Sequence, residues 1–196
     1  ATRNPDLLAA LTGDYGTAER TIAAKIQTRT AAAGSDLSAE GSRRATQDSI
    51  RALMLIRAYR VMGHLVADLD PLGLTERKTH KELRPETYGF TEADLDRPVF
   101  IDNVLGLETA TVRQILKILR RTYCRKIGVE FMHITSPVQK SWIQERIEGE
   151  EKDIRFTAEG KKAILNKLIE AESFEKFAEV KYTGTKRFGL EGGESM

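Results

Sequence analysis

The residues of this 196-residue chain best suited to chemistry are a glycine-rich closing string, three histidines and one cysteine. The string KRFGLEGGES, residues 186–195, places three glycines directly after a Lys-Arg pair, an arrangement that could surround a phosphate. It matches neither G-x-G-x-x-G nor G-x-x-x-x-G-K-[ST], and no predicted strand precedes it. By itself the string is therefore weak evidence for phosphate binding.

The three histidines, His64, His80 and His133, stand far apart in the sequence. Metal sites on helices usually bring two ligands together at short spacing, and no such pair occurs here. We therefore expect no metal site, and we expect scattered structural or surface roles. His64, in RAYRVMGHL, is the most interesting of the three because it follows a glycine on an arginine-bearing helix. A hydrogen-bonded packing histidine is still favoured there over a catalytic one.

Cys124 lies in TYCRKIG, among basic neighbours that would lower the pKa of a thiol and make it more reactive. The alternative, a small half-buried residue at a helix end, is favoured, because no Cys-His or Ser-His-Asp arrangement can be argued from the spacing. We predict no catalytic residue in this chain.

Composition excludes several classes of protein. Basic and acidic residues number 31 and 29, a net charge of +2, so there is no strongly basic surface of the kind that nucleic acid requires. The longest apolar run, ALMLI at 52–56, is far too short to cross a bilayer. A single cysteine suits a reducing compartment, and we expect a cytoplasmic protein without nucleic-acid or membrane partners.

Periodicity predicts helices for most of the chain. The strongest is expected from about Thr46 to Asp68 and ends before Pro71, which lacks an amide proton. Its predicted apolar stripe is Ile50, Leu53, Met54, Val61, Leu65 and Leu69. A second helix carries the stripe Val112, Ile115, Leu116, Leu119 and Tyr123.

Capping residues indicate two further helices. Ser136 and Gln139 form a capping box around Pro137, and Trp142, Ile143 and Ile147 are expected to be buried. Thr157 is expected to cap the next helix, with a kink near Glu172. The residues expected to face inward in that helix are Ile164, Leu165, Leu168 and Ile169, followed by Phe174 and Phe177.

The expected organisation is mainly α, a region resembling a helical bundle. Residues 1–34 form a weakly apolar helical arm, 35–44 a linker rich in small residues, and 45–185 a helical domain. Residues 186–196 are expected to be the start of a truncated second domain. The chain opens on Ala1 and stops soon after the glycines, which indicates a piece of a longer protein, with a processed mature start as the alternative.

Several long strings, in order, resemble the thiamine diphosphate-dependent decarboxylating (first) component of 2-oxoglutarate dehydrogenase in its bacterial form. They are IRAYRVMGHLVADLDPLGL at 56–74, RRTYCRKIGVEFMHI at 120–134 and KRFGLEGGES at 186–195. The intervening YGFTEADLDRPVFIDNVLGLETATVRQIL and WIQERIEG are similar to the same family. The resemblance covers roughly residues 45–196 and is weak over residues 1–44, where the composition matches but no motif does.

The resemblance implies an amino-terminal fragment of an enzyme of the tricarboxylic acid cycle. That enzyme decarboxylates 2-oxoglutarate on thiamine diphosphate with Mg²⁺ and passes the succinyl group to a lipoyl group of a partner acyltransferase. The matched region would be a helical segment preceding an α/β thiamine-binding domain, and the full-length enzyme would be a homodimer. No bound cofactor and no turnover are expected for this chain alone.

One cofactor contact is implied by the resemblance. The family places the arginine of the KRF string at the cofactor cleft, which here is Arg187, and a guanidinium suits an anionic diphosphate. Gly189 stands where some members have serine, so no side-chain hydroxyl contact is transferred. A different class of function also remains open, a non-catalytic helical module that binds a protein partner through an exposed apolar stripe.

Overall fold

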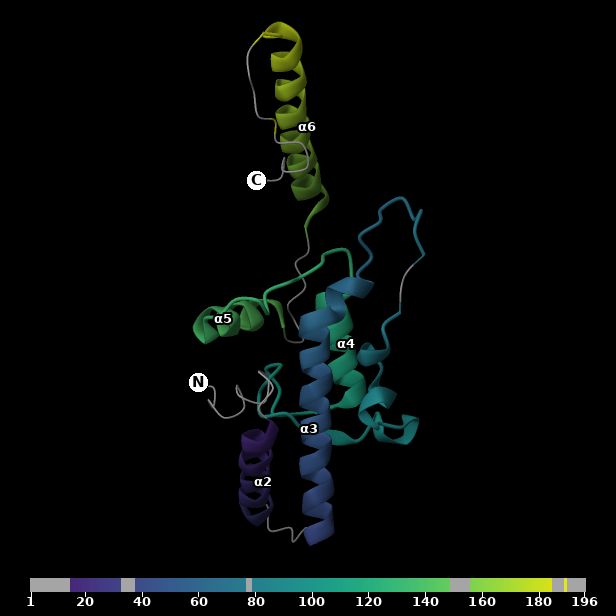
Figure 1. Ribbon diagram of the computed structural model, residues 1–196, viewed down its shortest axis with the longest axis vertical. Coiled ribbons are helices and arrows are strands. Elements are labelled where there is room, and N and C mark those ends of the chain that lie inside the picture. The colour runs from purple at the N-terminus through teal and green to yellow at the C-terminus, as the bar shows by residue number, and fades with distance from the viewer. Residues whose placement is uncertain (1–14, 33–37, 77–78, 149–155, 185–188, 190–196) are drawn as a thin grey trace. The chain divides into compact units, whose positions relative to one another are not determined.

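The computed structural model describes residues 15–32, 38–76, 79–148, 156–184 and 189 (Figure 1). Two compact units divide the chain, residues 1–152 and 153–196, and each is described separately here. The division after Lys152 falls inside the predicted domain 45–185. The fold is mainly helical, as predicted, with one small sheet. No described helix combines the length and the apolar character needed to cross a bilayer.

Within its described residues, the first unit contains four α-helices, four short 3-10 turns and a two-stranded sheet. The α-helices are α2 (Tyr15–Ala32), α3 (Ala39–Met62), α4 (Val112–Tyr123) and α5 (Pro137–Ile147). The 3-10 turns are η1 (Gly63–Val66), η2 (Lys81–Leu83), η3 (Pro85–Tyr88) and η4 (Glu92–Asp94). The strands are β1 (Pro98–Phe100) and β2 (Thr109–Thr111), antiparallel with Val99 opposite Ala110.

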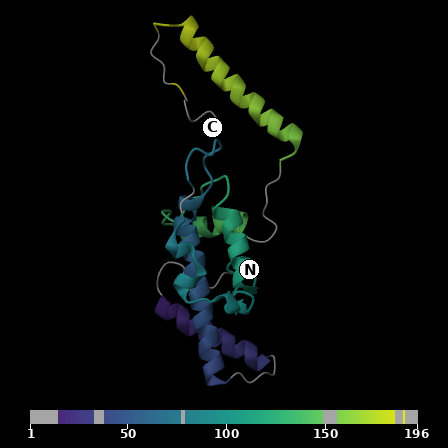
Figure 2. The same ribbon diagram turned by 90° about the vertical axis from the view of Figure 1, so that its right-hand side faces the viewer.

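The core of this unit forms around α3. Figures 1 and 2 show α2 crossing the first half of α3 and α4 lying alongside its second half. The α4 stripe predicted from periodicity is confirmed, because all five of its residues are buried: Val112, Ile115, Leu116, Leu119 and Tyr123. They meet the buried apolar residues of α3, which are Ala52, Leu53, Leu55, Ile56, Ala58 and Tyr59. Apolar burial between α3 and α4 fixes the positions of the side chains that these two helices carry.

Helix α3 begins earlier and ends earlier than predicted. Ser38 caps it, its Oγ accepting a hydrogen bond from the amide of Gly41 at 3.1 Å, so residues 39–44 are helical rather than part of a linker. The predicted linker is thus wrong in its second half, since a good N-cap precedes residues that favour helix. The α-helix stops at Met62, where Gly63 begins a 3-10 turn. The distal stripe residues Leu65 and Leu69 are consequently exposed.

The segment between α3 and α4 contains the four 3-10 turns and the two strands. Leu83 and Pro85, on two of these turns, are buried. Thr91 caps η4 in a capping box with Asp94. The brief apolar run at 98–102 forms β1 and buries Val99 and Ile101 against the core.

Helix α5 starts as predicted but packs differently. Ser136 is its N-cap and Pro137 its first residue. Trp142, expected to be buried, is 54% exposed, and the guanidinium of Arg146 lies 3.6 Å from its ring centroid. Gln144 is the buried residue of the helix, while Ile143 and Ile147 are only partly buried. The apolar pattern of so short a helix therefore did not identify its inner face.

The second unit contains α6 (Ala158–Lys181). Thr157 caps it as predicted, its Oγ1 accepting from the amide of Gly160 at 3.0 Å. The helix continues without interruption through Glu172, where a kink was expected. None of its residues is buried, so the prediction that its apolar residues face inward is wrong for the described part of this unit.

Candidate functional site

The one cofactor-binding residue expected from the sequence, Arg187, lies outside the described residues, as do most of the closing glycines. Among the residues that the structure describes, no group of three or more His, Cys, Asp and Glu side chains could hold a metal ion. The candidate site is a depression on the surface of the first unit.

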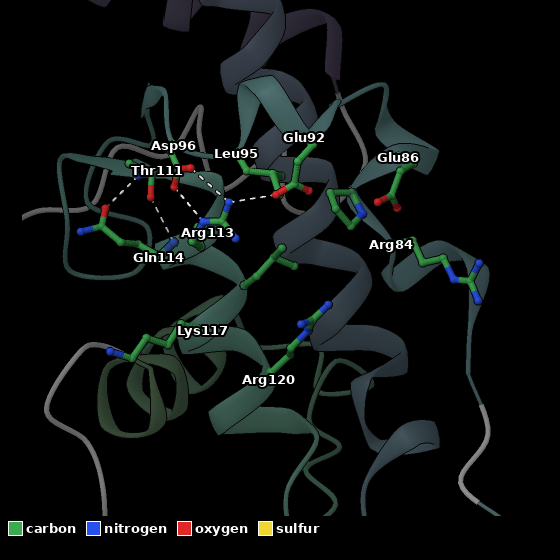
Figure 3. Close-up of a pocket in the computed structure, with 12 residues that line it drawn as sticks. Arg84, Glu86, Glu92, Leu95, Asp96, Thr111, Arg113, Gln114, Lys117 and Arg120 are labelled. Atoms are coloured by element: carbon green, nitrogen blue, oxygen red, sulfur yellow. Dashed lines mark hydrogen bonds and ion pairs between the residues drawn. The ribbon is translucent and has the colours of Figure 1, made fainter.

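A surface depression with a volume of about 1050 Å³ lies between the 3-10 turns, the end of β2 and α4 (Figure 3). We call it the α4 depression. It is lined by Arg84, Pro85, Glu86, Glu92, Leu95, Asp96, Thr111, Arg113, Gln114, Leu116, Lys117 and Arg120. Leu116 and Pro85 supply buried apolar atoms, and most of the remaining lining side chains are charged or polar.

Two capping arrangements fix the walls of the α4 depression. Thr111 caps α4 by accepting from the amide of Gln114 at 3.1 Å, while the Gln114 side chain accepts from the amide of Thr111 at 2.8 Å. In η4, Thr91 and Asp94 exchange the equivalent contacts, and these hydrogen bonds hold the pKa of Asp94 well below its usual range. Both turns are thereby fixed without any contribution from a ligand.

Arg113 is the most connected residue of the α4 depression. Its Nε donates to Asp96 Oδ1 at 2.7 Å, and its Nη2 donates to Glu92 Oε1 at 3.0 Å (Figure 3). These contacts raise the pKa of Arg113, and the hydrogen bond from Arg113 lowers the pKa of Asp96. One guanidinium thus pairs with two carboxylates, so this part of the surface carries one uncompensated negative charge.

Three further cations line the α4 depression. Neither Arg84 nor Lys117 has an ion-pair partner among the described residues, and in Figure 3 they point away from each other. Arg120 donates from Nε to the hydroxyl of Tyr59 at 3.4 Å, and Tyr59 donates in turn to the carbonyl of Leu83 at 2.9 Å. Burial raises the pKa of Tyr59, so its phenol stays protonated near neutral pH. Arg120 and Tyr59 are thereby engaged in hydrogen bonds, while Arg84 and Lys117 have no ion-pair partner within the described residues.

A buried polar cluster lies deeper in the same unit. Arg60 is 1% exposed, and its Nε and Nη2 each donate to a different carboxylate oxygen of Glu148 at 2.6 Å. The hydroxyl of Tyr123 donates to the same carboxylate at 2.5 Å. Burial, followed by the charge of Glu148, raises the pKa of Tyr123. Burial alone would lower the pKa of Arg60, but Glu148 raises it overall. The cluster joins α3, α4 and the end of α5, a structural role.

Sequence reasoning missed this cluster. Arg60 lies in the sequence among the apolar residues of the helix predicted from about Thr46 to Asp68, and nothing near it indicates Glu148 as its partner. Cys124 and His64 have the positions expected for residues with structural roles. Cys124 is the half-buried C-cap residue of α4, and His64 Nε2 contacts Glu130 Oε1 at 3.4 Å.

Comparison with known proteins identifies relatives of this chain, which the geometry of the α4 depression does not. No protein-family model matches the chain. A protein from Brucella canis named 2-oxoglutarate dehydrogenase E1 component is 59% identical over 200 residues, covering 98% of this chain and 20% of that protein. Proteins of the same name from Brucella suis and Brucella abortus are 58% identical over the same shares. The chain therefore spans about a fifth of the length of the curated relatives it matches.

The similarity confirms the family resemblance drawn from the sequence strings. It also extends that resemblance, because coverage of 98% includes most of residues 1–44, where no motif had been found. The similarity therefore includes most of residues 1–44, over which the sequence strings gave only a weak resemblance.

Proposed function

We propose that this chain, which is related over almost its entire length to the E1 component of 2-oxoglutarate dehydrogenase, is an amino-terminal part of such an enzyme. The longer enzyme would decarboxylate 2-oxoglutarate oxidatively and transfer the succinyl group to a lipoyl group. The observation that carries the proposal is the identity of 59% over 98% of the chain. Similarity of that extent is far stronger support than any single motif.

Within the enzyme, we propose that residues 15–148 act as a non-catalytic helical layer. The described residues hold no cluster fit for Mg²⁺, and Arg113, Asp96 and Arg120 of the α4 depression are engaged in hydrogen bonds within the protein. Thiamine diphosphate, which supplies the carbanion chemistry when bound, would therefore be held mainly by other parts of the longer enzyme. A homodimer, a lipoyl-bearing succinyltransferase partner and a cytoplasmic location complete the proposal.

The test compares this chain with the encoded protein at the length of its relatives. With 2-oxoglutarate, thiamine diphosphate, Mg²⁺ and an artificial electron acceptor, the longer protein should turn over and the 196-residue chain should not. Turnover by the short chain would contradict its non-catalytic role. A longer protein that binds the cofactor but leaves 2-oxoglutarate unchanged would contradict the assignment itself.

Arg187 remains a proposed contact to the diphosphate of the cofactor. In the longer enzyme, Arg187→Met should weaken binding of thiamine diphosphate about 10- to 100-fold, the usual effect of losing a charge-assisted hydrogen bond. Calorimetric titration of thiamine diphosphate in the presence of Mg²⁺ measures this directly. Lys186→Met is the matched control and should leave the affinity unchanged, so equal losses in both variants would assign the effect to net charge.

A second candidate function is an autonomous helical module that binds a protein partner. It is favoured by the exposed apolar residues of α6, such as Phe174 at 70% and Val180 at 80% exposure. Such a module would be a fully folded monomer as the 196-residue chain, and its folding would not require further polypeptide. Size-exclusion chromatography with hydrogen exchange distinguishes it from a part of a larger fold.

A further inference from the structure

Helix α6 carries several large apolar side chains that are exposed to solvent, although charged residues are interspersed among them. It is 24 residues long, and none of its residues is buried. Five large apolar side chains between positions 164 and 177 are about half exposed or more: Ile164, Leu165, Ile169, Phe174 and Phe177. A lone helix gains little stability in water from its own hydrogen bonds, and apolar packing normally supplies the remainder.

The apolar residues of α6 occupy two faces rather than one. With about 100° of rotation per residue, Ile164, Leu165, Leu168 and Ile169 lie together along one side of the first half. In the second half, Ala171, Phe174, Phe177 and Ala178 follow one another at steps of three, three and one, on the roughly opposite side. The apolar surface therefore changes sides near the middle of the helix.

This arrangement distinguishes two kinds of occupant. A helix that docks reversibly into a groove presents a single apolar stripe to its partner and keeps the opposite face polar. A helix whose apolar residues lie on roughly opposite sides in its two halves has to pack against neighbours on both sides. The paired charged residues lie opposite the apolar face of their own half, Lys167 with Glu170 in the first and Lys176 with Glu172 in the second, each pair at 2.6 Å. The two faces thus require cover from two directions.

We infer that α6 packs on two sides against further polypeptide, and that the polypeptide covering both faces is the further part of the same chain that its relatives possess. The inference rests on the proposed function, since this chain spans only a fifth of those relatives. A covalently attached segment is present at millimolar effective concentration, which favours it over a separate protein as the occupant.

Hydrogen exchange measured by mass spectrometry tests the inference on the encoded protein at the length of its relatives. Amides of residues 163–180 should exchange at least ~100-fold more slowly there than in the 196-residue chain, as expected when an exposed helix becomes part of a core. Equal exchange in the two chains would overturn the inference. So would protection of the short chain that grows with its own concentration, because a second copy would then be the occupant.

Paired variants test the two faces separately in the longer protein. Leu165→Asp and Phe174→Asp should each raise the exchange rate of α6 at least ~10-fold. Their neighbours Asn166→Asp and Ser173→Asp introduce the same charge on the other sides of the helix and should have little effect. Equal effects within each pair would contradict the two-face arrangement. Turnover of 2-oxoglutarate is measured in parallel, so an active enzyme with unprotected α6 overturns this inference alone, and an inactive one with protected α6 overturns the proposed function alone.

Discussion

Arg60 of α3 and Glu148, the residue that follows α5, form a buried ion pair with two contacts of 2.6 Å. Both side chains are almost inaccessible to solvent, at 1% and 2% exposure. Tyr123 of α4 completes the pair from a third direction. Removing water from two charges is costly, so this cluster serves to fix the relative positions of three elements rather than to add stability.

Removing the charge of Glu148 should destabilise the first unit strongly. Glu148→Gln leaves the guanidinium of Arg60 buried without a counter-charge, and we expect a loss of about 3–5 kcal/mol in the free energy of unfolding. Urea unfolding followed by circular dichroism measures it. Glu86→Gln makes the same exchange on the exposed rim of the α4 depression and should change little. A loss below about 1 kcal/mol for Glu148→Gln would show that the pair is not enclosed.

The same pair shows where sequence reasoning reached its limit. The stripe of α4 was predictable because five apolar residues recur at helical spacing and all are buried in one core. Arg60 was not, because its partner lies 88 residues further along the chain and an arginine beside an apolar stripe normally extends into water. Only the tertiary fold brings these two charges together.

Burial of Tyr123 makes the stability of the first unit fall at high pH. Its pKa is raised by burial and by Glu148, while in the unfolded chain it is near 10. Above about pH 10 the unfolded state loses the phenolic proton and the folded state keeps it, so the free energy of unfolding falls as pH rises. The slope from this residue is up to ~1.4 kcal/mol per pH unit.

Tyr123→Phe should remove that part of the slope between pH 10 and pH 11, and should lower stability at neutral pH by about 1.5–3 kcal/mol because the hydrogen bond to Glu148 is lost. Urea titrations at several pH values provide the measurement. Tyr182→Phe, a change at an exposed tyrosine of the other unit, should preserve both quantities. An unchanged slope in Tyr123→Phe would mean that its hydroxyl reaches solvent.

Gly63 allows the chain leaving α3 to pass close to α4. A Cβ atom at Gly63 would lie 2.5 Å from the Cβ of Tyr123, a separation that real side chains do not tolerate. Gly63→Ala should therefore cost about 1–3 kcal/mol or more, by overpacking the contact between the two helices. Gly73→Ala separates this effect from backbone strain, because Gly73 has a φ of +67° and open space around it. It should cost about 1 kcal/mol, and Gly184→Ala should cost little.

Gly63 also explains one error in the predicted boundaries of α3. Apolar spacing continues through Leu65 and Leu69, so the pattern alone extends the helix to Asp68. The close approach to Tyr123 instead fixes a glycine at position 63, and the chain tightens into a 3-10 turn there. A pattern of residue types cannot report such a contact, which depends on a helix that begins almost fifty residues later.

Arg113 controls the ionisation of Asp96 in the α4 depression. The hydrogen bond from Arg113 lowers the pKa of Asp96, so this carboxylate favours the folded state above the ordinary aspartate pKa and loses that contribution as pH falls through its lowered value. Arg113→Gln should raise the pKa of Asp96 toward the ordinary range while changing overall stability little, because these side chains are exposed. Titration of the aspartate carboxyl carbons by NMR measures the change.

Two internal controls accompany that titration. The pKa of Asp94 is lowered chiefly by Thr91 and then by Arg97, so it should stay low in Arg113→Gln. Arg84→Gln removes a cation that lines the same depression without contacting Asp96, and the pKa of Asp96 should not move. If both arginine variants shifted Asp96 equally, the long-range field of the depression would control it. The contact at 2.7 Å between Arg113 Nε and Asp96 Oδ1 would then not be formed in solution.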